Sequence, residues 1–395
     1  MKLKQNESGF HHVGLLLLVI VLTVTGFVGW RVYQNNSGGG NPSNQSLTPL
    51  DGRIVNAFKD VGCPQQVKPA VNKSYYQGPL IDSHFHPPSI PDPSPGDTDY
   101  LKERTFNSLG VNITMSEIVC MFKNDGSTPR NILSFFPVWP NIYELQLQVV
   151  KQTLEKYPGM FVPFINPPDS DNSVNGSQTV DAEQLDKMLS VYPGLFAGYG
   201  EIGLYGREGG ARPLPPDSPR LQEIYKVLRK HKIKRVFFHL GEGTKDSFER
   251  VLRANRDISF IFHGDQLITQ RQNGTQDISQ VEAIVKNNPN VAYGIDELFG
   301  DVFLLNEKGN KQQVLKHFSD YGPLLDKDKA TWKGFIERYP DQVMWDTDRG
   351  TYLWVMDLDV GRALVSYARA FIATLDPNVQ EKYAYKNAER ILTDQ

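Results

Sequence analysis

The chain has 395 residues, of which 39% are hydrophobic and 11% aromatic, so it can bury a large core and is not a disordered protein. Its 42 Lys and Arg residues against 45 Asp and Glu residues give a net charge of −3, which argues against a general nucleic-acid-binding surface. Its two cysteines, Cys63 and Cys120, form no C-x-x-C pair and therefore indicate neither a cysteine zinc site nor a disulfide-rich scaffold. One disulfide between them in an oxidising compartment stays open.

An uncharged apolar run, residues 13–30, follows a short N-terminal segment of residues 1–12. Its length is within the range needed for a helix that crosses a bilayer. No small-residue cleavage site follows the run, so we expect a retained transmembrane signal-anchor rather than a removed signal peptide. Lys2 and Lys4 precede the run and only Arg31 follows it directly. This asymmetry predicts a cytoplasmic N-terminus and a single-pass protein of the cell membrane whose main body is extracytoplasmic.

Residues 31–50 are predicted to form a flexible linker. The stretch 34–46, QNNSGGGNPSNQS, is rich in Gly, Asn and Ser and carries no charge, which is the composition of a flexible tether. Residues 51–395 would then form one large domain that carries the function.

The predicted domain contains eight short runs that are apolar nearly throughout, as expected for strands buried on both faces of a parallel sheet. We expect these strands at 78–84, 110–119, 161–167, 196–204, 235–240, 258–264, 291–296 and 342–348. Helical patterns separate them: segment 143–158 has apolar residues at helical spacing, and segment 218–232 begins with the helix-start pair Ser-Pro. Eight such units indicate an α/β fold and match the (β/α)₈ TIM barrel in number and size. A doubly wound open sheet is the alternative, but the first strand–helix turn has no G-x-G-x-x-G.

Side chains capable of chemistry gather at the ends of the predicted strands, where the active site of a barrel lies. Four of the six histidines beyond the N-terminal pair fall there, together with carboxylates. The set consists of His84, His86, Glu201, His239, His263, Asp346 and Asp348. Any single histidine among them could be an ordinary core residue, but their joint position on one rim is hard to explain by packing.

Imidazole and carboxylate groups are the ligands of zinc and similar divalent cations. The two histidines of the motif HFH, His84 and His86, stand at positions i and i+2 of a strand end, so both point to the same side. The set could hold one divalent metal ion or two, with zinc the expected metal. Glu201 is the natural candidate to bridge two ions.

The order of these residues, H-x-H, then Glu in GEIGL, then His, His and Asp, resembles the amidohydrolase superfamily of metal-dependent hydrolases. Within it, the pattern is most similar to the TatD-like and amidohydrolase-related branches, and the resemblance covers most of residues 78–350. It implies that His84 and His86 bind one metal and that Glu201 ligates or bridges. His239 and His263 would complete that site or bind a second ion.

The resemblance also implies that Asp348 is both a metal ligand and the catalytic aspartate, because DTD aligns with the T-D or S-D ending of those families. Asp346 remains the alternative. Arg349 and Gly350 follow where the TatD pattern has Ala-Pro, and the stretch between His263 and Asp348 is long, so the substrate stays open.

The implied activity is hydrolysis of an amide, ester or lactone bond in a small-molecule substrate by a metal-activated water. A TatD-like phosphodiesterase or nuclease is the first alternative, disfavoured by the near-neutral charge. The second is a catalytically inactive, surface-anchored binding protein, disfavoured by the complete ligand set. Arg349, Arg207 and Tyr205 lie close to proposed ligands in the sequence and are candidate substrate-binding residues. Other candidates on the same rim are Arg212, Glu242, Asp265 and Glu297.

Overall fold

The structure is a computed structural model that describes residues 49–63, 71–90, 108–168, 180–205, 214–271, 276–296, 298, 310–350 and 353–393. These residues belong to one compact unit, Pro49–Gln395. The predicted N-terminal segment and signal-anchor, and nearly all of the predicted linker, lie outside the described residues. Within the described ranges, no helix is both long enough and apolar enough to cross a membrane. The structure therefore lends the predicted anchor no support, and the anchor stays a prediction from the sequence.

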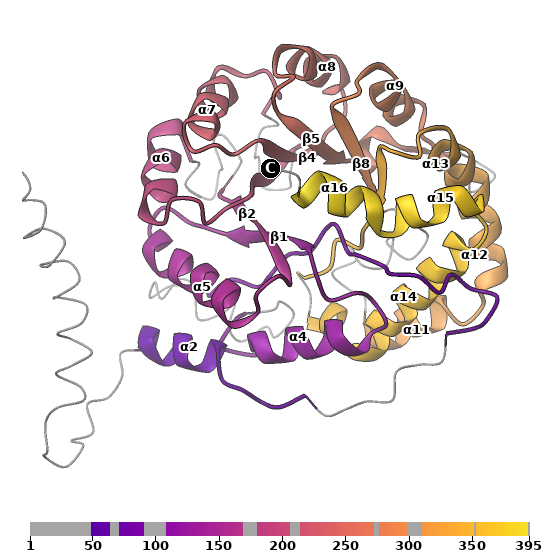
Figure 1. Cartoon of the computed structure of the whole chain (residues 1–395), viewed down its shortest axis with the longest axis horizontal. Coiled ribbons are helices and arrows are strands. Elements are labelled where there is room, and N and C mark those ends of the chain that lie inside the picture. Colours follow the sequence, from indigo (N-terminus) through magenta and orange to yellow (C-terminus); the bar gives the residue numbers. More distant parts are fainter. Residues whose placement is uncertain are drawn as a thin grey trace, which may run out of the picture. The chain divides into compact units, whose positions relative to one another are not determined.

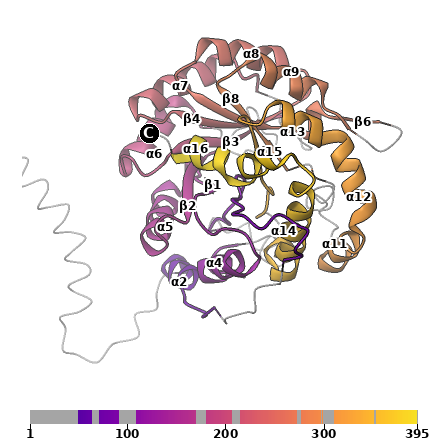
Figure 2. The same cartoon turned by 45° about the vertical axis from the view of Figure 1, so that its right-hand side comes forward.

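The centre of the unit is a sheet of seven parallel strands in the order β1-β2-β3-β4-β5-β8-β9 (Figure 1). The strands are β1 (Ile132–Pro137), β2 (Phe161–Asn166), β3 (Gly198–Leu204), β4 (Arg235–Leu240), β5 (Ser259–His263), β8 (Val291–Ile295) and β9 (Val343–Trp345). A separate antiparallel pair, β6 (Thr269–Gln270) and β7 (Gln276–Asp277), lies outside this sheet (Figure 2). Every neighbouring pair in the main sheet is parallel, so all its strands end on the same side.

The segment that carries the HFH motif connects the two edges of the sheet. Phe85 forms parallel bridges both to Ser134 in β1 and to Arg349 just after β9. The backbone N–H of Phe85 donates to the carbonyl of Leu133 at 3.0 Å, and that of His86 donates to the carbonyl of Arg349 at 2.7 Å. The first and last strands are therefore joined through this segment, which occupies the position of an eighth strand. The arrangement is compatible with a TIM-like barrel.

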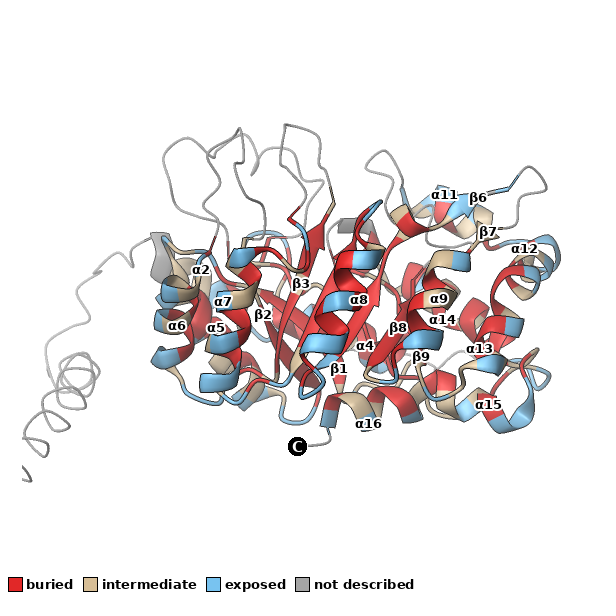
Figure 3. Ribbon diagram, turned by 90° about the horizontal axis from the view of Figure 1, so that it is seen from above, coloured by how far each residue is buried: buried red, intermediate tan, exposed pale blue. Residues whose placement is uncertain are grey.

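Helices alternate with the strands and surround them (Figures 1 and 2). They are α2 (Pro49–Ala57), α4 (Met115–Asn124), α5 (Tyr143–Lys156), α6 (Ala182–Val191), α7 (Pro219–Lys230), α8 (Lys245–Ala254), α9 (Ser279–Asn287), α11 (Lys311–His317), α12 (Tyr321–Asp328), α13 (Gly334–Arg338), α14 (Leu358–Ile372), α15 (Pro377–Glu381) and α16 (Asn387–Thr393). Short 3₁₀ or π segments are η1 (Asp265–Leu267), η2 (Lys329–Lys333), η3 (Leu353–Met356) and η4 (Lys382–Lys386). Their inward faces and the strands are buried, while their outward faces are exposed (Figure 3).

A small cluster of buried side chains, separate from the main hydrophobic core, comes mainly from alternate strand positions. Its members include Leu133, Phe135, Val162, Phe164, Phe237, Ile261, Ala292 and Met344, with Ala388 and Leu392 of α16. Alternate positions share one face of a strand, so these side chains gather on one face of the sheet. The rings of Phe135 and Phe237 each lie 5.0 Å from the ring of His84. Apolar side chains of this cluster therefore pack against the ring of His84.

Six of the eight predicted strands contain an observed strand, and the first predicted strand, 78–84, ends one residue before the bridging residue Phe85. The prediction of a strand at 110–119 is wrong, because helix α4 begins there. Thr114 caps this helix: its hydroxyl accepts from the N–H of Glu117 at 3.2 Å, and the Glu117 carboxylate accepts from the N–H of Thr114 at 2.7 Å. The missing strand is β1, which was not predicted.

Cys63 and Cys120 form a disulfide, with their Cα atoms 5.4 Å apart. The bond ties the chain after α2 to helix α4. It answers the question that the sequence leaves open about these two cysteines.

Candidate metal centre

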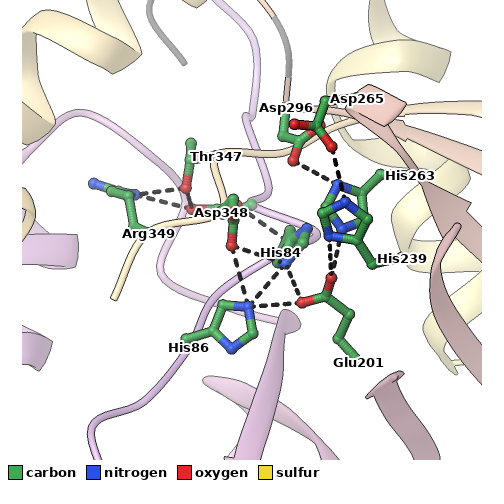
Figure 4. A network of polar contacts seen from close by, with 11 residues as sticks. His84, His86, Glu201, His239, His263, Asp265, Asp296, Thr347, Asp348 and Arg349 are labelled. Atoms are coloured by element: carbon green, nitrogen blue, oxygen red, sulfur yellow. Dashed lines mark hydrogen bonds and ion pairs between the residues drawn. The ribbon is translucent and has the colours of Figure 1, made fainter. Parts of the chain in front are cut away.

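Four ligand-type atoms from three separate segments meet at one point (Figure 4). The Nε2 atoms of His84 and His86 are 3.0 Å apart. Each of them lies 2.9–3.2 Å from Oε2 of Glu201 and 3.1 Å from Oδ1 of Asp348. A tetrahedral cation with ligands at about 2.0–2.1 Å keeps those ligands roughly 3.3 Å apart. Both the chemistry and the spacing of this first ligand group therefore fit a divalent metal ion.

The extended backbone of the HFH motif explains how two imidazoles reach one point. His84 and His86 share a side of the segment, and the residue between them points the opposite way. Phe85 is fully buried, and its ring packs against those of Phe122 and Phe161, at centroid distances of 5.0 and 6.2 Å. Phe85 thus anchors the segment in the core while its two neighbours face the site.

A second ligand group shares Glu201 with the first. Its other oxygen, Oε1, lies 3.0 Å from Nδ1 of His239 and 2.5 Å from Nε2 of His263. The two histidines stand opposite each other in the register of β4 and β5. Glu201 in β3 thus places one carboxylate oxygen on each group, which is the geometry of a carboxylate that bridges two cation positions.

Further polar groups hold the two histidines of the second group. Nε2 of His239 lies 2.9 Å from Oδ1 of Asp265 and 2.6 Å from Oε1 of Gln266. Nδ1 of His263 lies 2.7 Å from Oδ2 of the buried Asp296. Carboxylates behind a ligating imidazole fix its ring orientation and raise its basicity.

The carboxylates and imidazoles of the two ligand groups shift one another's pKa values. Burial opposes protonation of His84, but Asp348 and Glu201 outweigh it and raise its pKa well above the ordinary value. Burial likewise opposes protonation of His263, yet Asp296 and Glu201 raise its pKa. Burial favours a neutral Glu201, but His263 and His84 hold its pKa well below the ordinary range. Without a cation, protons on the imidazoles supply the positive charge that balances these carboxylates, and a bound divalent cation would replace them.

Of the two aspartates in DTD, the structure places Asp348 on the ligand group. The backbone of Asp348 has φ +47°, a left-handed conformation that turns the chain at this point. Asp346 is buried, and neither of its carboxyl oxygens has a hydrogen-bond partner among the described residues. Burial and the nearby charge of Asp296 raise the pKa of Asp346 well above its ordinary value, which favours the neutral form of this carboxyl.

The structure does not bear out Arg349 as a substrate-binding residue. Its side chain is 0% exposed, and its guanidinium points away from the ligand groups to Asp82 and Asp125. Position in the sequence next to Asp348 does not place its side chain on the same side, because the chain turns at Asp348, which has φ +47°.

The remaining predicted pocket residues have different outcomes. Arg207, Arg212 and Glu297 lie outside the described residues. The ring of Tyr205 lies 4.2 Å from that of His239, so Tyr205 borders the second ligand group. Glu242 is exposed, and no contact places it at the ligand atoms.

Two residues of the site were not predicted from the sequence, Asp296 and Gln266. Asp296 directly follows β8, so the rule that led to the histidines at strand ends could have found it too. Gln266 lies in the short helix η1, and no sequence signal marks it.

The chain was compared with protein families, curated proteins and solved structures. No family model matches the sequence, and no curated protein matches it. Among solved structures, an amidohydrolase from Burkholderia multivorans with bound HEPES matches with a TM-score of 0.48 and 11% identity, over 80% of this chain and 99% of that one. A protein from Agrobacterium tumefaciens matches with a TM-score of 0.47 and 10% identity, over 84% and 99%. A TatD homologue from Escherichia coli matches with a TM-score of 0.41 and 14% identity, over 79% and 97%.

Proposed function

We propose that the chain is a metal-dependent hydrolase that cleaves an amide, ester or lactone bond of a small molecule with an activated water. The observation that carries the proposal is the meeting of four ligand atoms, with each histidine nitrogen 2.9–3.2 Å from an oxygen of Glu201 and of Asp348, and with Glu201 extending to a second group of two histidines. The proposal includes closure of the sheet into a (β/α)₈ barrel, supported by the two bridges of Phe85.

Each residue of the site can be given a role in such a reaction. His84, His86, Glu201 and Asp348 would hold one divalent cation, with zinc the expected metal. A cation bound there supplies an activated water near neutral pH and polarises the bond under attack. Asp348 also lies at this point and would accept the proton of the water and deliver it to the leaving group. Glu201 would keep the two ligand groups at a fixed separation.

His239 and His263, with the second oxygen of Glu201, would hold a second cation. Tyr205 covers one side of this position and would contact the substrate beside it. Among the described residues, Asp265 and Tyr205 are neighbours of the second group.

We further propose that residues 13–30 anchor the protein in the cell membrane and that the hydrolase domain is extracytoplasmic. The uncharged run and the position of Lys2 and Lys4 support this. The Cys63–Cys120 disulfide supports it independently, because structural disulfides persist in oxidising compartments.

A phosphodiesterase is the second candidate function. Two adjacent cation positions bridged by one carboxylate suit the in-line displacement of a phosphoester. The net charge of −3 opposes a nucleic-acid substrate, so a small phosphodiester would be the expected target.

The test begins with the purified full chain in detergent. Its metal content is measured by elemental analysis, and zinc- or manganese-supplemented protein is then assayed against esters, amides, lactones and phosphodiesters. We expect one or two divalent ions per chain and turnover of a carbonyl substrate. The variant His84→Ala should lose both the bound metal and the turnover. The control variant His317→Ala, which replaces a histidine on α11, should keep the metal and the turnover. A wild-type chain that binds metal and hydrolyses none of these classes would favour the binding-protein alternative, and a chain that binds no metal would refute the proposal.

A further inference from the structure

Arg349 is a buried cation held by carboxylates from two different segments. Its Nη1 donates to Oδ2 of Asp125 at 2.8 Å, and its Nη2 donates to Oδ2 of Asp82 at 3.1 Å. All three side chains are fully buried. The face of the guanidinium lies 4.7 Å from the ring centre of Phe122. The group therefore has one fixed position, set by two charges and an aromatic face.

The partners of Arg349 flank the proposed metal ligands in the sequence. Oγ1 of Thr347 accepts from Nε of Arg349 at 3.1 Å and donates to Oδ2 of Asp82 at 2.6 Å. The other oxygen of Asp82 accepts from the backbone N–H of His84 at 3.2 Å. The network thus contains both neighbours of Asp348 and reaches the backbone of His84 (Figure 4).

The backbone on the other side of Asp348 is equally constrained. Asp348 has φ +47° and Gly350 has φ +144°, so the chain makes a tight turn that ordinary side chains disfavour. A Cβ atom at Gly350 would lie 1.9 Å from the carbonyl oxygen of His86, so this turn packs directly on the HFH segment. A non-glycine residue keeps a left-handed conformation only where its surroundings hold it there.

We propose that Arg349 is a positioning residue of the metal centre. Its forked guanidinium sets the separation between Asp348 on one segment and His84 with His86 on the other. The inference rests on the proposed function, since it assumes that these residues bind a metal. Lysine would keep the charge but could not bind both carboxylates in the same geometry, because its ammonium is a single point.

Arg369 supplies a matched control for this proposal. It is also buried, and its guanidinium also donates to several acceptors, the carbonyls of Tyr76, Gly78 and Gly126. None of these acceptors belongs to a proposed ligand or to its neighbours. Arg349→Lys and Arg369→Lys therefore both replace a buried guanidinium that donates several hydrogen bonds. Only Arg349→Lys does so beside the proposed metal centre.

The experiment compares Zn²⁺ affinity, measured by competition with a chromophoric chelator, and the visible absorption of bound Co²⁺. We expect Arg349→Lys to weaken Zn²⁺ binding at least 10-fold and to change the position or intensity of the Co²⁺ bands, as loss of support behind metal ligands commonly does. Arg369→Lys should lower the melting temperature by a similar amount and leave both metal readouts within twofold of wild type.

Thr347→Val provides a second variant that keeps the shape of the side chain. It removes the hydroxyl between Arg349 and Asp82, and we expect a several-fold loss of Zn²⁺ affinity with an altered Co²⁺ spectrum. It decides the question if Arg349→Lys does not fold. Unchanged affinity and spectrum in Thr347→Val, or equal effects of the two Arg→Lys variants, would overturn the positioning role. Failure of wild type to bind either ion would refute the proposed function instead.

Discussion

At the scale of single residues, Glu201 is the side chain on which the centre depends. Its two oxygens contact different pairs of histidines, so one carboxylate belongs to both ligand groups. Metal positions that share a carboxylate would be coupled, because a cation on one oxygen fixes the orientation of the other oxygen. Only a carboxylate or another two-ended ligand can serve in this way.

The assignment of Asp348 as proton acceptor leads to a first prediction. Asp348→Asn leaves an oxygen near the ligand position but removes the group that accepts a proton. At saturating metal, kcat on the best substrate should fall at least 100-fold, which is the lower range for loss of general acid–base catalysis.

Asp346→Asn is the matched control for Asp348→Asn. Because neither carboxyl oxygen of Asp346 has a hydrogen-bond partner among the described residues, a neutral amide of the same shape should change kcat only a few-fold. The reverse pattern, with Asp346→Asn inactive and Asp348→Asn active, would exchange the roles of the two aspartates.

The contact between Asp296 and His263 leads to a second prediction. Asp296→Asn removes the negative charge 2.7 Å behind the imidazole. The second cation position should then bind Zn²⁺ about 10–100-fold more weakly. The first position should keep its affinity, so a titration that resolves the two positions checks the prediction.

The control for Asp296→Asn is Asp186→Asn. Asp186 also places a carboxylate oxygen 2.6 Å from a histidine nitrogen, that of His231. His231 is not a proposed ligand. Loss of Zn²⁺ affinity in both variants would show a general effect of lost carboxylates and contradict a specific role for Asp296.

At the scale of elements, the buried parallel strands could be predicted from the sequence and their neighbours could not. Strands β4, β5 and β8 are short apolar runs with polar flanks, and their predicted bounds differ by at most one residue from those observed. Segment 110–119 is a similar apolar run, and periodicity alone does not separate a short buried helix from a strand. The Thr-x-x-Glu pattern at Thr114 and Glu117 was the signal that would have separated them.

The reciprocal hydrogen bonds between Thr114 and Glu117 at the start of α4 lead to a prediction about stability. Thr114→Ala removes the acceptor for the N–H of Glu117 and should lower the free energy of unfolding by about 1 kcal/mol. Chemical denaturation of wild type and variant measures this difference. Metal affinity should not change, since neither residue contacts the ligand groups. Thr114→Ser keeps the acceptor and should retain most of the stability, whereas an equal loss in both variants would exclude the cap as the cause.

At the scale of the whole molecule, the sequence predicts the residues of the candidate site more completely than it predicts the strands and contacts that bring them together. His239 and His263 lie at the carboxyl ends of β4 and β5, Asp348 follows β9, and Glu201 lies in the middle of β3. A parallel sheet brings strand ends together whatever the exact pairing. The direction of a side chain off the strand is a different matter. Arg349 looked like a substrate contact because it follows Asp348, yet its side chain reaches Asp82 and Asp125, which are 267 and 224 residues away in the sequence. Only the packed structure reveals such partners.

The charge balance of the whole centre predicts how metal and pH act together on stability. Asp348 and Glu201 outweigh burial and raise the pKa of His84, and Asp296 and Glu201 do so for His263. In the metal-free protein, the stability gained from these raised pKa values is fully present below the unfolded pKa of about 6.5. It is lost as the pH rises through the folded values. A divalent cation binds only neutral imidazole, so its binding expels these protons and strengthens as the pH rises.

Zinc should therefore stabilise the protein little at pH 5 and increasingly up to pH 8. At a free metal concentration of 100 times Kd, the gain in the free energy of unfolding is about 2.7 kcal/mol. Thermal unfolding of the full chain with and without Zn²⁺ across this range measures the gap between the two melting temperatures. His84→Ala should show little gap at any pH, because it lacks a ligand. A gap in wild type that stays constant from pH 5 to 8 would contradict proton–metal exchange at these histidines, since their protons would then not compete with the ion.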